Sequence, residues 1–120
     1  MGLQCLSTIT IKSPDGLLKQ VGCGHCRNCT TKRQLAWALR IYLEASCSAY
    51  SNFLTLTYEE DMRPETLDYA HIQQFLQRLR KSFRRSIRYF CVGEYGNLSG
   101  REHWHLILFN TPFQLQVYST

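Results

Sequence analysis

The stretch 102–109, Glu-His-Trp-His-Leu-Ile-Leu-Phe, constrains the fold more than any other part of the sequence. Successive side chains of a β-strand point to opposite faces, so His103 and His105 project together from one face. The other face carries the apolar side chains of Trp104, Leu106 and Leu108. Two imidazoles on one face of an otherwise apolar strand favour a pair of ligands over two core histidines bonded to the backbone.

The segments around this strand predict an α+β domain. Residues 52–58 and 87–94 are rich in strand-forming residues. Asp68 can cap a helix that runs to about Arg84, with one apolar stripe formed by Tyr69, Ile72, Phe75, Leu76, Leu79 and Phe83. An earlier helix is predicted at 31–49 from the spacing of Leu35, Leu39, Tyr42 and Leu43. This order of elements predicts an antiparallel sheet with helices on one face.

A hairpin brings a carboxylate to the histidines. If the turn spans roughly 95–101, Glu94 lies opposite or diagonal to His103 or His105, and same-face Cβ atoms across such a pair are about 5 to 8 Å apart. A register slip of one residue would move Glu94 to the other face. A carboxylate without a partner on an apolar sheet is costly. Two neutral imidazoles and one carboxylate therefore predict a three-ligand site for a divalent cation, with open coordination positions.

A second group of ligands lies near the N-terminus. Cys23, Cys26 and Cys29 follow the spacing C-x2-C-x2-C in a loop-forming stretch. Cys5 can supply a fourth thiolate for a tetrahedral Zn²⁺, because a turn at 13–16 between two extended pieces lets the chain fold back. An iron–sulfur cluster and a set of free or oxidised thiols are the alternatives.

The rest of the sequence indicates the state of the other cysteines and the division of the chain into segments. No secretory signal is seen in the sequence, so a disulfide scaffold is disfavoured. Cys47 and Cys91 are expected to be small buried hydrophobes. No apolar run approaches the roughly 20 residues that span a bilayer, which argues against a membrane protein. We expect a Cys-rich, zinc-binding segment at 1–30, packed on a core formed by 31–120.

The distribution of charge indicates an anionic partner. Lys and Arg outnumber Asp and Glu by 14 to 9, and the net charge is +5. Six basic residues without an intervening acid are concentrated in one stretch: Arg78, Arg80, Lys81, Arg84, Arg85 and Arg88. The alternative is an ordinary solvated helix face, but arginine favours bidentate contacts with phosphate. We expect these six residues to bind DNA.

The motifs resemble a known superfamily. His103-Trp104-His105 and the apolar residues after it resemble the His-hydrophobic-His motif of HUH single-strand endonucleases, and 53–58 resembles their first strand motif. The match is closer to the replication initiators of microviruses, especially the gokushovirus branch. The corresponding motifs occur in the same order, at 23–29, 53–58, 78–81, 93–96 and 100–105. The resemblance covers the chain from Cys23 to Phe109.

The resemblance implies a fold and an activity. It implies an HUH or Rep-like core, related to ferredoxin-like and RRM-like sheets, in which Glu94, His103 and His105 hold Mg²⁺ or Mn²⁺. It also implies initiation of rolling-circle replication, in which a tyrosine nicks and rejoins single-stranded DNA through a 5′-phosphotyrosyl intermediate. The implied partners are the replication origin and the host replication machinery, in the cytoplasm of a bacterial host.

The sequence departs from the family at the nucleophile, which the family carries on a later helix in a Tyr-x-x-Lys or paired-tyrosine pattern. No tyrosine here fits either pattern: Tyr95 should face away from Glu94, and the tail around Tyr118 is too short for the helix. We therefore expect a C-terminally incomplete initiator whose nucleophile lies beyond Thr120. The chain by itself is expected to bind metal and DNA, with nicking left to the longer protein.

Three other classes of protein share some of these features. One is a non-catalytic zinc-containing nucleic-acid-binding module, in which the histidines are structural. An HUH-type transposase would share the metal ligands and the chemistry, but the cysteine cluster and the motif at 93–96 favour the initiator. Histidine-triad nucleotide hydrolases need a third histidine where Ile107 stands, so they are disfavoured.

Overall fold

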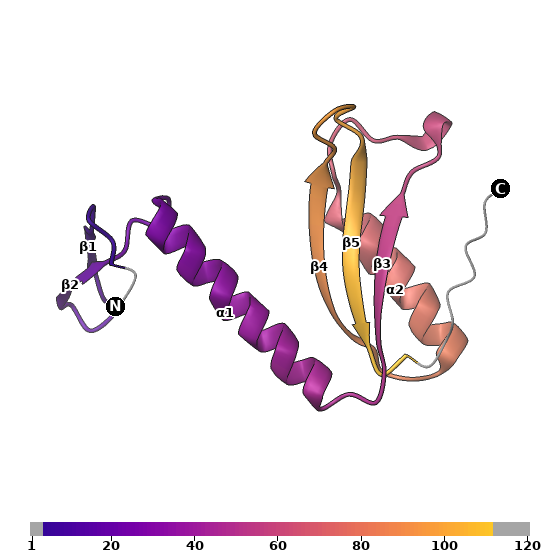
Figure 1. Ribbon diagram of the computed structural model, residues 1–120, viewed down its shortest axis with the longest axis horizontal. Helices are drawn as coiled ribbons and strands as arrows, with labels where there is room; N and C mark the ends of the chain where they lie inside the picture. The colour runs from indigo at the N-terminus through magenta and orange to yellow at the C-terminus, as the bar shows by residue number, and fades with distance from the viewer. Residues whose placement is uncertain (1–3, 112–120) are drawn as a thin grey trace. The chain divides into compact units, whose positions relative to one another are not determined.

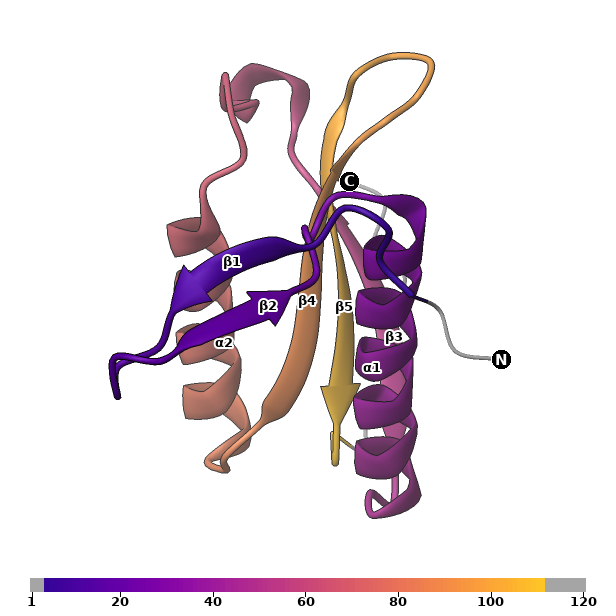
Figure 2. The ribbon, with the colours of Figure 1, turned by 90° about the vertical axis from the view of Figure 1, so that its left-hand side faces the viewer.

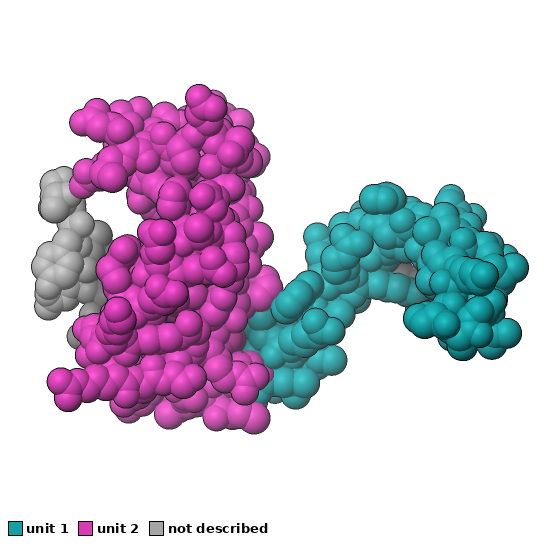
Figure 3. Space-filling model, turned by 180° about the vertical axis from the view of Figure 1, so that it is seen from behind, with its two compact units in different colours: residues 1–43 teal, residues 44–120 magenta. Residues whose placement is uncertain are grey.

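The computed structural model describes residues 4–111 of the chain. The chain forms two compact units, residues 1–43 and 44–120, which are called unit 1 and unit 2 below (Figure 3). The division falls later than the boundary expected after residue 30, because helix α1 (Arg27–Ser46) runs on unbroken from the cysteine segment. The packing of 1–30 on the core stays a prediction.

Unit 1 consists of a hairpin and most of α1. Strands β1 (Ile9–Lys12) and β2 (Leu18–Val21) pair in antiparallel fashion, as Figure 2 shows. The predicted turn at 13–16 is confirmed: the Gly16 amide donates to the Ser13 carbonyl at 2.8 Å, and Gly16 takes a φ of +86° that favours glycine. No described residue of unit 1 is buried.

Helix α1 begins earlier than the sequence pattern predicted. The Cys26 carbonyl accepts a hydrogen bond from the Thr30 amide at 2.9 Å, so the first turn forms inside the cysteine cluster rather than after it. The helix ends at Ser46, three residues before the predicted end at Ala49. Among the described residues, no helix is both long enough and apolar enough to cross a membrane.

Unit 2 is built on a three-stranded antiparallel sheet (Figure 1). Strands β3 (Ser51–Thr57) and β4 (Arg88–Tyr95) flank β5 (Glu102–Phe109), which pairs with both. All three strands were predicted to within two residues. β5 is the central strand, and its side chains at 102, 104, 106 and 108 are buried, whereas those at 103, 105 and 107 are half-buried.

Helix α2 (Tyr69–Phe83) also follows the prediction. The Asp68 side chain accepts a hydrogen bond from the Ala70 amide at 2.9 Å, which caps the helix, and Arg84 ends it in a left-handed conformation. A short 3₁₀ helix, η1 (Glu60–Met62), lies in the connection from β3. The chain thus has an α+β fold with antiparallel sheets. The similarity of its sheet and helices to HUH or RRM-like cores stays a prediction.

The core of unit 2 lies between α2 and one face of the sheet (Figures 1 and 2). The buried side chains that form it are Leu54, Ile72, Leu76, Ile87, Trp104, Leu106 and Leu108. The predicted alternation along β5 is confirmed for residues 102–108, and Phe109 is buried as well. The opposite face, which carries His103 and His105, is covered by no described helix of unit 2.

The two isolated cysteines differ from each other. Cys47 is exposed, contrary to the expected burial, because it follows the end of α1 in the link to β3. Cys91 is half-buried on the α2 side of β4, where burial raises the pKa of its thiol.

Candidate metal centre

Glu94, His103 and His105 lie together on the open face of the sheet. The register of β4 and β5 pairs Glu94 with His103 and places His105 opposite Val92. One carboxylate oxygen of Glu94, Oε2, is 3.6 Å from Nε2 of His103 and 3.3 Å from Nε2 of His105. The predicted hairpin geometry is confirmed, and three possible ligand atoms lie within 4.8 Å of one another.

The turn between β4 and β5 fixes this register. The Gly96 amide donates to the Arg101 carbonyl at 2.9 Å, and the Gly100 amide donates to the Gly96 carbonyl at 2.7 Å. Gly100 has a φ of +63°, a conformation that favours glycine. Because side chains alternate with a period of two, a turn one residue longer would point Glu94 towards α2.

The other ring nitrogens decide which atoms are free for a ligand. Nδ1 of His103 lies 3.0 Å from the Arg101 carbonyl, which can only accept, so Nδ1 must carry the proton. Nε2 of the neutral ring then presents a lone pair towards Glu94. Nδ1 of His105 lies 3.1 Å from the Thr55 hydroxyl, which can accept in the same way. This is the arrangement of metal-ligating histidines, whose second nitrogen donates to a neighbouring oxygen.

Two neighbours of the site were missed by the sequence analysis. Thr55 lies opposite His105 in the β3–β5 register, and the ring of Phe53 stacks on His105 with centroids 5.5 Å apart. Phe53 is 63% exposed, so its ring is available to a bound molecule. Both side chains alternate with the buried Leu54, but their closeness to His105 depends on a strand pairing that local sequence does not reveal.

The tyrosines of β4 and α2 do not face this site. Tyr95 lies on the α2 side, as predicted, where its hydroxyl accepts a hydrogen bond from the Leu67 amide at 3.0 Å. The hydroxyls of Tyr69 and Tyr89 are hydrogen-bonded to each other, and this contact, with burial, raises the pKa of Tyr69 to about 12. A raised pKa makes that phenol a poorer nucleophile.

Tyr58 is also held on the α2 side. Its hydroxyl lies 2.9 Å from Nδ1 of His71 and accepts a hydrogen bond from the Trp104 indole at 3.0 Å. These three residues, with Arg78, line a pocket of about 230 Å³ between β3 and α2. Tyr118 lies outside the described residues.

The six basic residues do not form one continuous free surface. Arg80 donates to the Ile87 carbonyl at 2.8 Å, Arg85 donates to the Asn110 carbonyl at 3.1 Å, and Arg88 pairs with Glu44 at 2.9 Å. The other three are exposed along α2 and at its end: Arg78, Lys81 and Arg84. DNA binding by this run stays a prediction, which concerns these three side chains most directly.

The four predicted cysteine ligands also come together, within unit 1. The Sγ atoms of Cys5, Cys23, Cys26 and Cys29 all lie within 4.8 Å of one another, and all four cysteines are free. Backbone amides of His25 and Cys26 lower the pKa of the Cys23 thiol to about 6. Although a backbone hydrogen bond with Gly24 opposes the shift, the neighbouring Cys26 thiol and burial raise the pKa of Cys29 to about 11.

Comparison with known proteins places this chain among phage replication proteins. The model of the family "Replication-associated protein ORF2/G2P" matches residues 51–119, which include all of the described sheet of unit 2. No solved structure matches the chain significantly.

Three curated relatives extend the match into unit 1. Replication-associated protein ORF4 of Chlamydia phage 1 is 38% identical over 92 residues, which are 72% of this chain and 23% of that protein. Replication-associated protein VP4 of Bdellovibrio phage phiMH2K is 32% identical over 73% of this chain and 31% of that protein. Replication-associated protein ORF2 of Spiroplasma virus 4 is 34% identical over 77% of this chain and 32% of that protein.

The chain thus spans less than a third of the length of each of these relatives. The resemblance to microvirus replication proteins is confirmed by the family match and by all three relatives. The chain belongs to the replication-associated protein ORF2/G2P family.

Proposed function

We propose that this chain carries the metal-binding sheet of a replication initiator that nicks and rejoins single-stranded DNA at an origin, as HUH endonucleases do. One observation carries the proposal: the Nε2 atoms of His103 and His105 both approach the same Glu94 oxygen, at 3.6 and 3.3 Å. Two lone pairs and a carboxylate repel one another unless a cation or a proton lies among them. Membership of a replication-associated family supports the DNA substrate.

Some residues of the site would bind the metal ion, and others would orient the two histidine rings. Glu94, His103 and His105 would hold Mg²⁺ or Mn²⁺, and the Arg101 carbonyl and the Thr55 hydroxyl would fix the two rings. A bound cation would neutralise charge on the scissile phosphate and polarise its non-bridging oxygens. Three ligands leave coordination positions for those oxygens, and the half-exposed carboxylate of Glu94 leaves the site accessible to DNA.

The proposed reaction is a transesterification. A tyrosine oxygen forms a bond to phosphorus, the bond from phosphorus to the 3′ oxygen breaks, and a proton passes from the phenol to the leaving oxygen through solvent. The products are a 5′-phosphotyrosyl protein and a free 3′-OH that primes synthesis; attack by a 3′-OH reverses the step and rejoins the strand. Because a phenol has a pKa of about 10, it is mostly protonated at neutral pH and needs an activated phosphate.

The nucleophile is proposed to lie outside the described residues of unit 2. Tyr58, Tyr69, Tyr89 and Tyr95 are engaged on the α2 side of the sheet, away from Glu94. The resemblance to microvirus initiators implies a tyrosine on a helix further along the protein. A complete protein would then bring that helix over the open face of the sheet.

Contacts with DNA are proposed beside the metal ligands and along α2, which packs on the other face of the sheet. Phe53 offers an exposed ring beside His105, which suits stacking with an unpaired base. The exposed cations Arg78, Lys81 and Arg84 would contact phosphates further along the strand. Origin DNA and the host replication machinery are the proposed partners of the whole protein.

A covalent adduct assay tests the function. A longer protein that contains this chain is incubated with single-stranded origin DNA and Mn²⁺, and the mixture is resolved on a denaturing gel. We expect an adduct that His103→Ala combined with His105→Ala abolishes, and that Glu94→Gln reduces by at least about tenfold. Glu59→Gln, at an exposed carboxylate before η1, is the matched control and should leave the yield unchanged.

Two results would overturn the proposal. An adduct that persists in the double histidine variant would show that these ligands do not serve the reaction. DNA binding without any adduct, in a protein that retains its tyrosines, would favour the non-catalytic nucleic-acid-binding module instead.

A further inference from the structure

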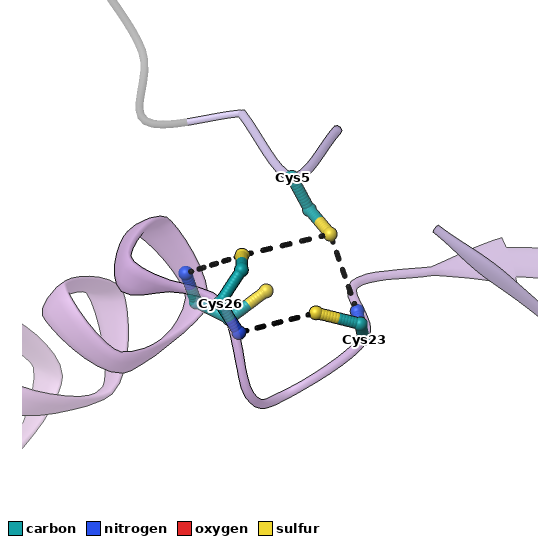
Figure 4. A group of neighbouring side chains, drawn as sticks. Cys5, Cys23 and Cys26 are labelled. Carbon is teal, nitrogen blue, oxygen red and sulfur yellow. Dashed lines mark hydrogen bonds between the residues drawn. The ribbon is translucent and has the colours of Figure 1, made fainter. Parts of the chain in front are cut away.

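Unit 1 brings four thiols together from three separate segments. Cys5 precedes β1, Cys23 follows β2, Cys26 immediately precedes α1, and Cys29 lies in the first turn of α1. In Figure 4 the side chains of Cys5, Cys23 and Cys26 point towards one another. Sulfur ligands at 2.3 Å from a tetrahedral Zn²⁺ lie about 3.8 Å from each other, and the Sγ atoms of Cys5 and Cys26 are 3.8 Å apart.

Backbone amides point at these sulfurs in a regular pattern. The Cys23 amide lies 3.3 Å from Sγ of Cys5, the Cys26 amide 3.3 Å from Sγ of Cys23, and the Cys29 amide 3.4 Å from Sγ of Cys26. The His25 amide donates to Sγ of Cys23 as well, at 3.5 Å. Hydrogen bonds from amides favour a charged acceptor over a neutral one, so the amides that point at Cys5 and Cys23 favour the thiolate, the form that binds metal.

Two glycines and two hydrogen bonds around the cluster allow the four sulfur atoms to lie close together. A Cβ on Gly22 would lie 2.8 Å from Sγ of Cys29, so a larger residue there would displace the sulfur. Gly24 has a φ of +79°, and its carbonyl accepts a hydrogen bond from Arg33 at 2.9 Å, which ties the loop to α1. Asn28 donates to the Gln4 carbonyl at 2.6 Å and so holds the segment of Cys5 against the helix.

The described residues of unit 1 have no hydrophobic core to hold them together. The β1–β2 hairpin and the first part of α1 contain no buried residue among those described. Small units without a hydrophobic core usually depend on disulfides or a metal, and these four cysteines are free. A set of four thiolates matches Zn²⁺ and leaves no position for a substrate, which is typical of a structural site.

We propose that Cys5, Cys23, Cys26 and Cys29 bind one structural Zn²⁺ that joins the β1–β2 hairpin to α1. This site is separate from the Glu94 cluster, and it does not depend on the nuclease function. Zinc binding displaces the thiol protons to solvent and changes no oxidation state. Removal of the ion leaves the hairpin without a fixed attachment to the helix.

Metal content tests the site directly. The chain is purified under reducing conditions with His103→Ala and His105→Ala in place, so that the second cluster cannot contribute an ion. We expect one Zn²⁺ per chain, released when a mercurial reagent titrates the thiols. After replacement by Co²⁺, the protein should show sulfur-to-cobalt charge-transfer absorption and the intense visible bands of a tetrahedral site.

Three variants separate this site from general thiol chemistry. Cys26→Ser should lose the zinc and the tetrahedral cobalt spectrum. Cys47→Ser is the matched control, because Cys47 is exposed and outside the cluster, and it should retain one zinc. Gly22→Ala keeps all four thiols but crowds Cys29, so it should weaken zinc affinity at least about tenfold.

Other outcomes would overturn the proposal. If the purified chain contains iron instead of zinc, the four cysteines form an iron–sulfur centre and the zinc proposal is wrong. Disulfides among the four cysteines after reducing purification, or an unchanged zinc content in Cys26→Ser, would exclude a four-thiolate site.

Discussion

The two units place their candidate ligands in opposite ways. In unit 2, Glu94, His103 and His105 project from a sheet whose other face is packed, with Leu76, Leu106 and Leu108 at most 1% exposed. In unit 1, the four cysteines come from loops and a helix end, with no buried residue beside them among those described. The sheet should therefore fold without its ion, whereas the hairpin of unit 1 should depend on its ion.

The ligand chemistry follows the same contrast. The Glu94 cluster offers three candidate ligands of mixed nitrogen and oxygen type and is open to solvent, which suits the phosphate-binding role proposed for it. The cysteine cluster is a closed set of four sulfurs, which suits a structural role. One ion would serve chemistry, and the other would serve folding.

The largest expected effect is the loss of order in unit 1 on chelation. Structural zinc contributes an apparent folding free energy of about 10 kcal/mol or more. A strong zinc chelator should therefore bring the amides of β1 and β2 to the exchange rates of an unfolded chain. Amides of β5 should keep their protection, as measured by hydrogen exchange. Equal loss of protection in both units would contradict the contrast.

A substitution in the core of unit 2 should destabilise unit 2 and leave unit 1 unchanged. Leu76→Ala removes a fully buried side chain between α2 and the sheet, and we expect it to destabilise unit 2 by about 2 to 5 kcal/mol. Urea unfolding followed by signals from β5 measures the change. The zinc content of unit 1 should stay the same. Leu98→Ala, at a fully exposed leucine, is the matched control and should have no measurable effect.

A smaller effect is expected at the residue that orients His105. Thr55→Val preserves the branched shape on β3 but removes the hydroxyl that meets Nδ1. Affinity for Mn²⁺ should fall about tenfold, because ring orientation and tautomer are no longer fixed. Titration calorimetry measures this change. Thr57→Val, on the same face of β3 and opposite His103, is the control and should change affinity little; an equal loss in both variants would refute the specific role.

The smallest effect concerns an ion pair on the α2 side of the sheet. Arg63 lies 3.0 Å from the carboxylate of Glu102, which is 8% exposed, and it lowers the pKa of Glu102. Because the pKa of Glu102 is lower in the folded protein, this carboxylate stabilises the fold at pH values above the ordinary glutamate pKa of about 4.3. The stabilisation is lost as the pH falls through the lowered pKa. Glu102→Gln should therefore destabilise unit 2 at pH 7 and much less at pH 3, measured by urea unfolding. A pH-independent difference would refute this linkage.

Local patterns predicted most of unit 2. The alternation along 102–109 and the short turn before it were sufficient to place Glu94 beside the histidines, because a hairpin depends only on neighbouring residues. Thr55 and Phe53 were missed because they reach His105 through the pairing of β3 with β5, some 50 residues apart. The partners of Arg85 and Arg88, Asn110 and Glu44, are similarly remote in sequence.

Unit 1 was predicted by ligand spacing rather than by hydrophobic pattern. The grouping of Cys5 with the other three cysteines follows from the turn at 13–16, which returns the chain. The start of α1 was placed too late because the Cys26 carbonyl, inside the cluster, accepts the first helical hydrogen bond. Cys47 was wrongly expected to be buried. The apolar character of a cysteine does not show whether it lies in the core or, as here, in the connection between a helix and a strand.

Paramagnetic broadening by Mn²⁺ tests the central claim that Glu94, His103 and His105 form one cation site. The measurement is an NMR titration of the chain with its cysteine cluster already saturated with zinc. We predict that signals of Phe53 and Val92, beside the histidines, broaden first, and that Glu94→Gln with His105→Ala removes this broadening. Broadening that persists in the variant, or that centres on the acidic residues of η1, would contradict the account.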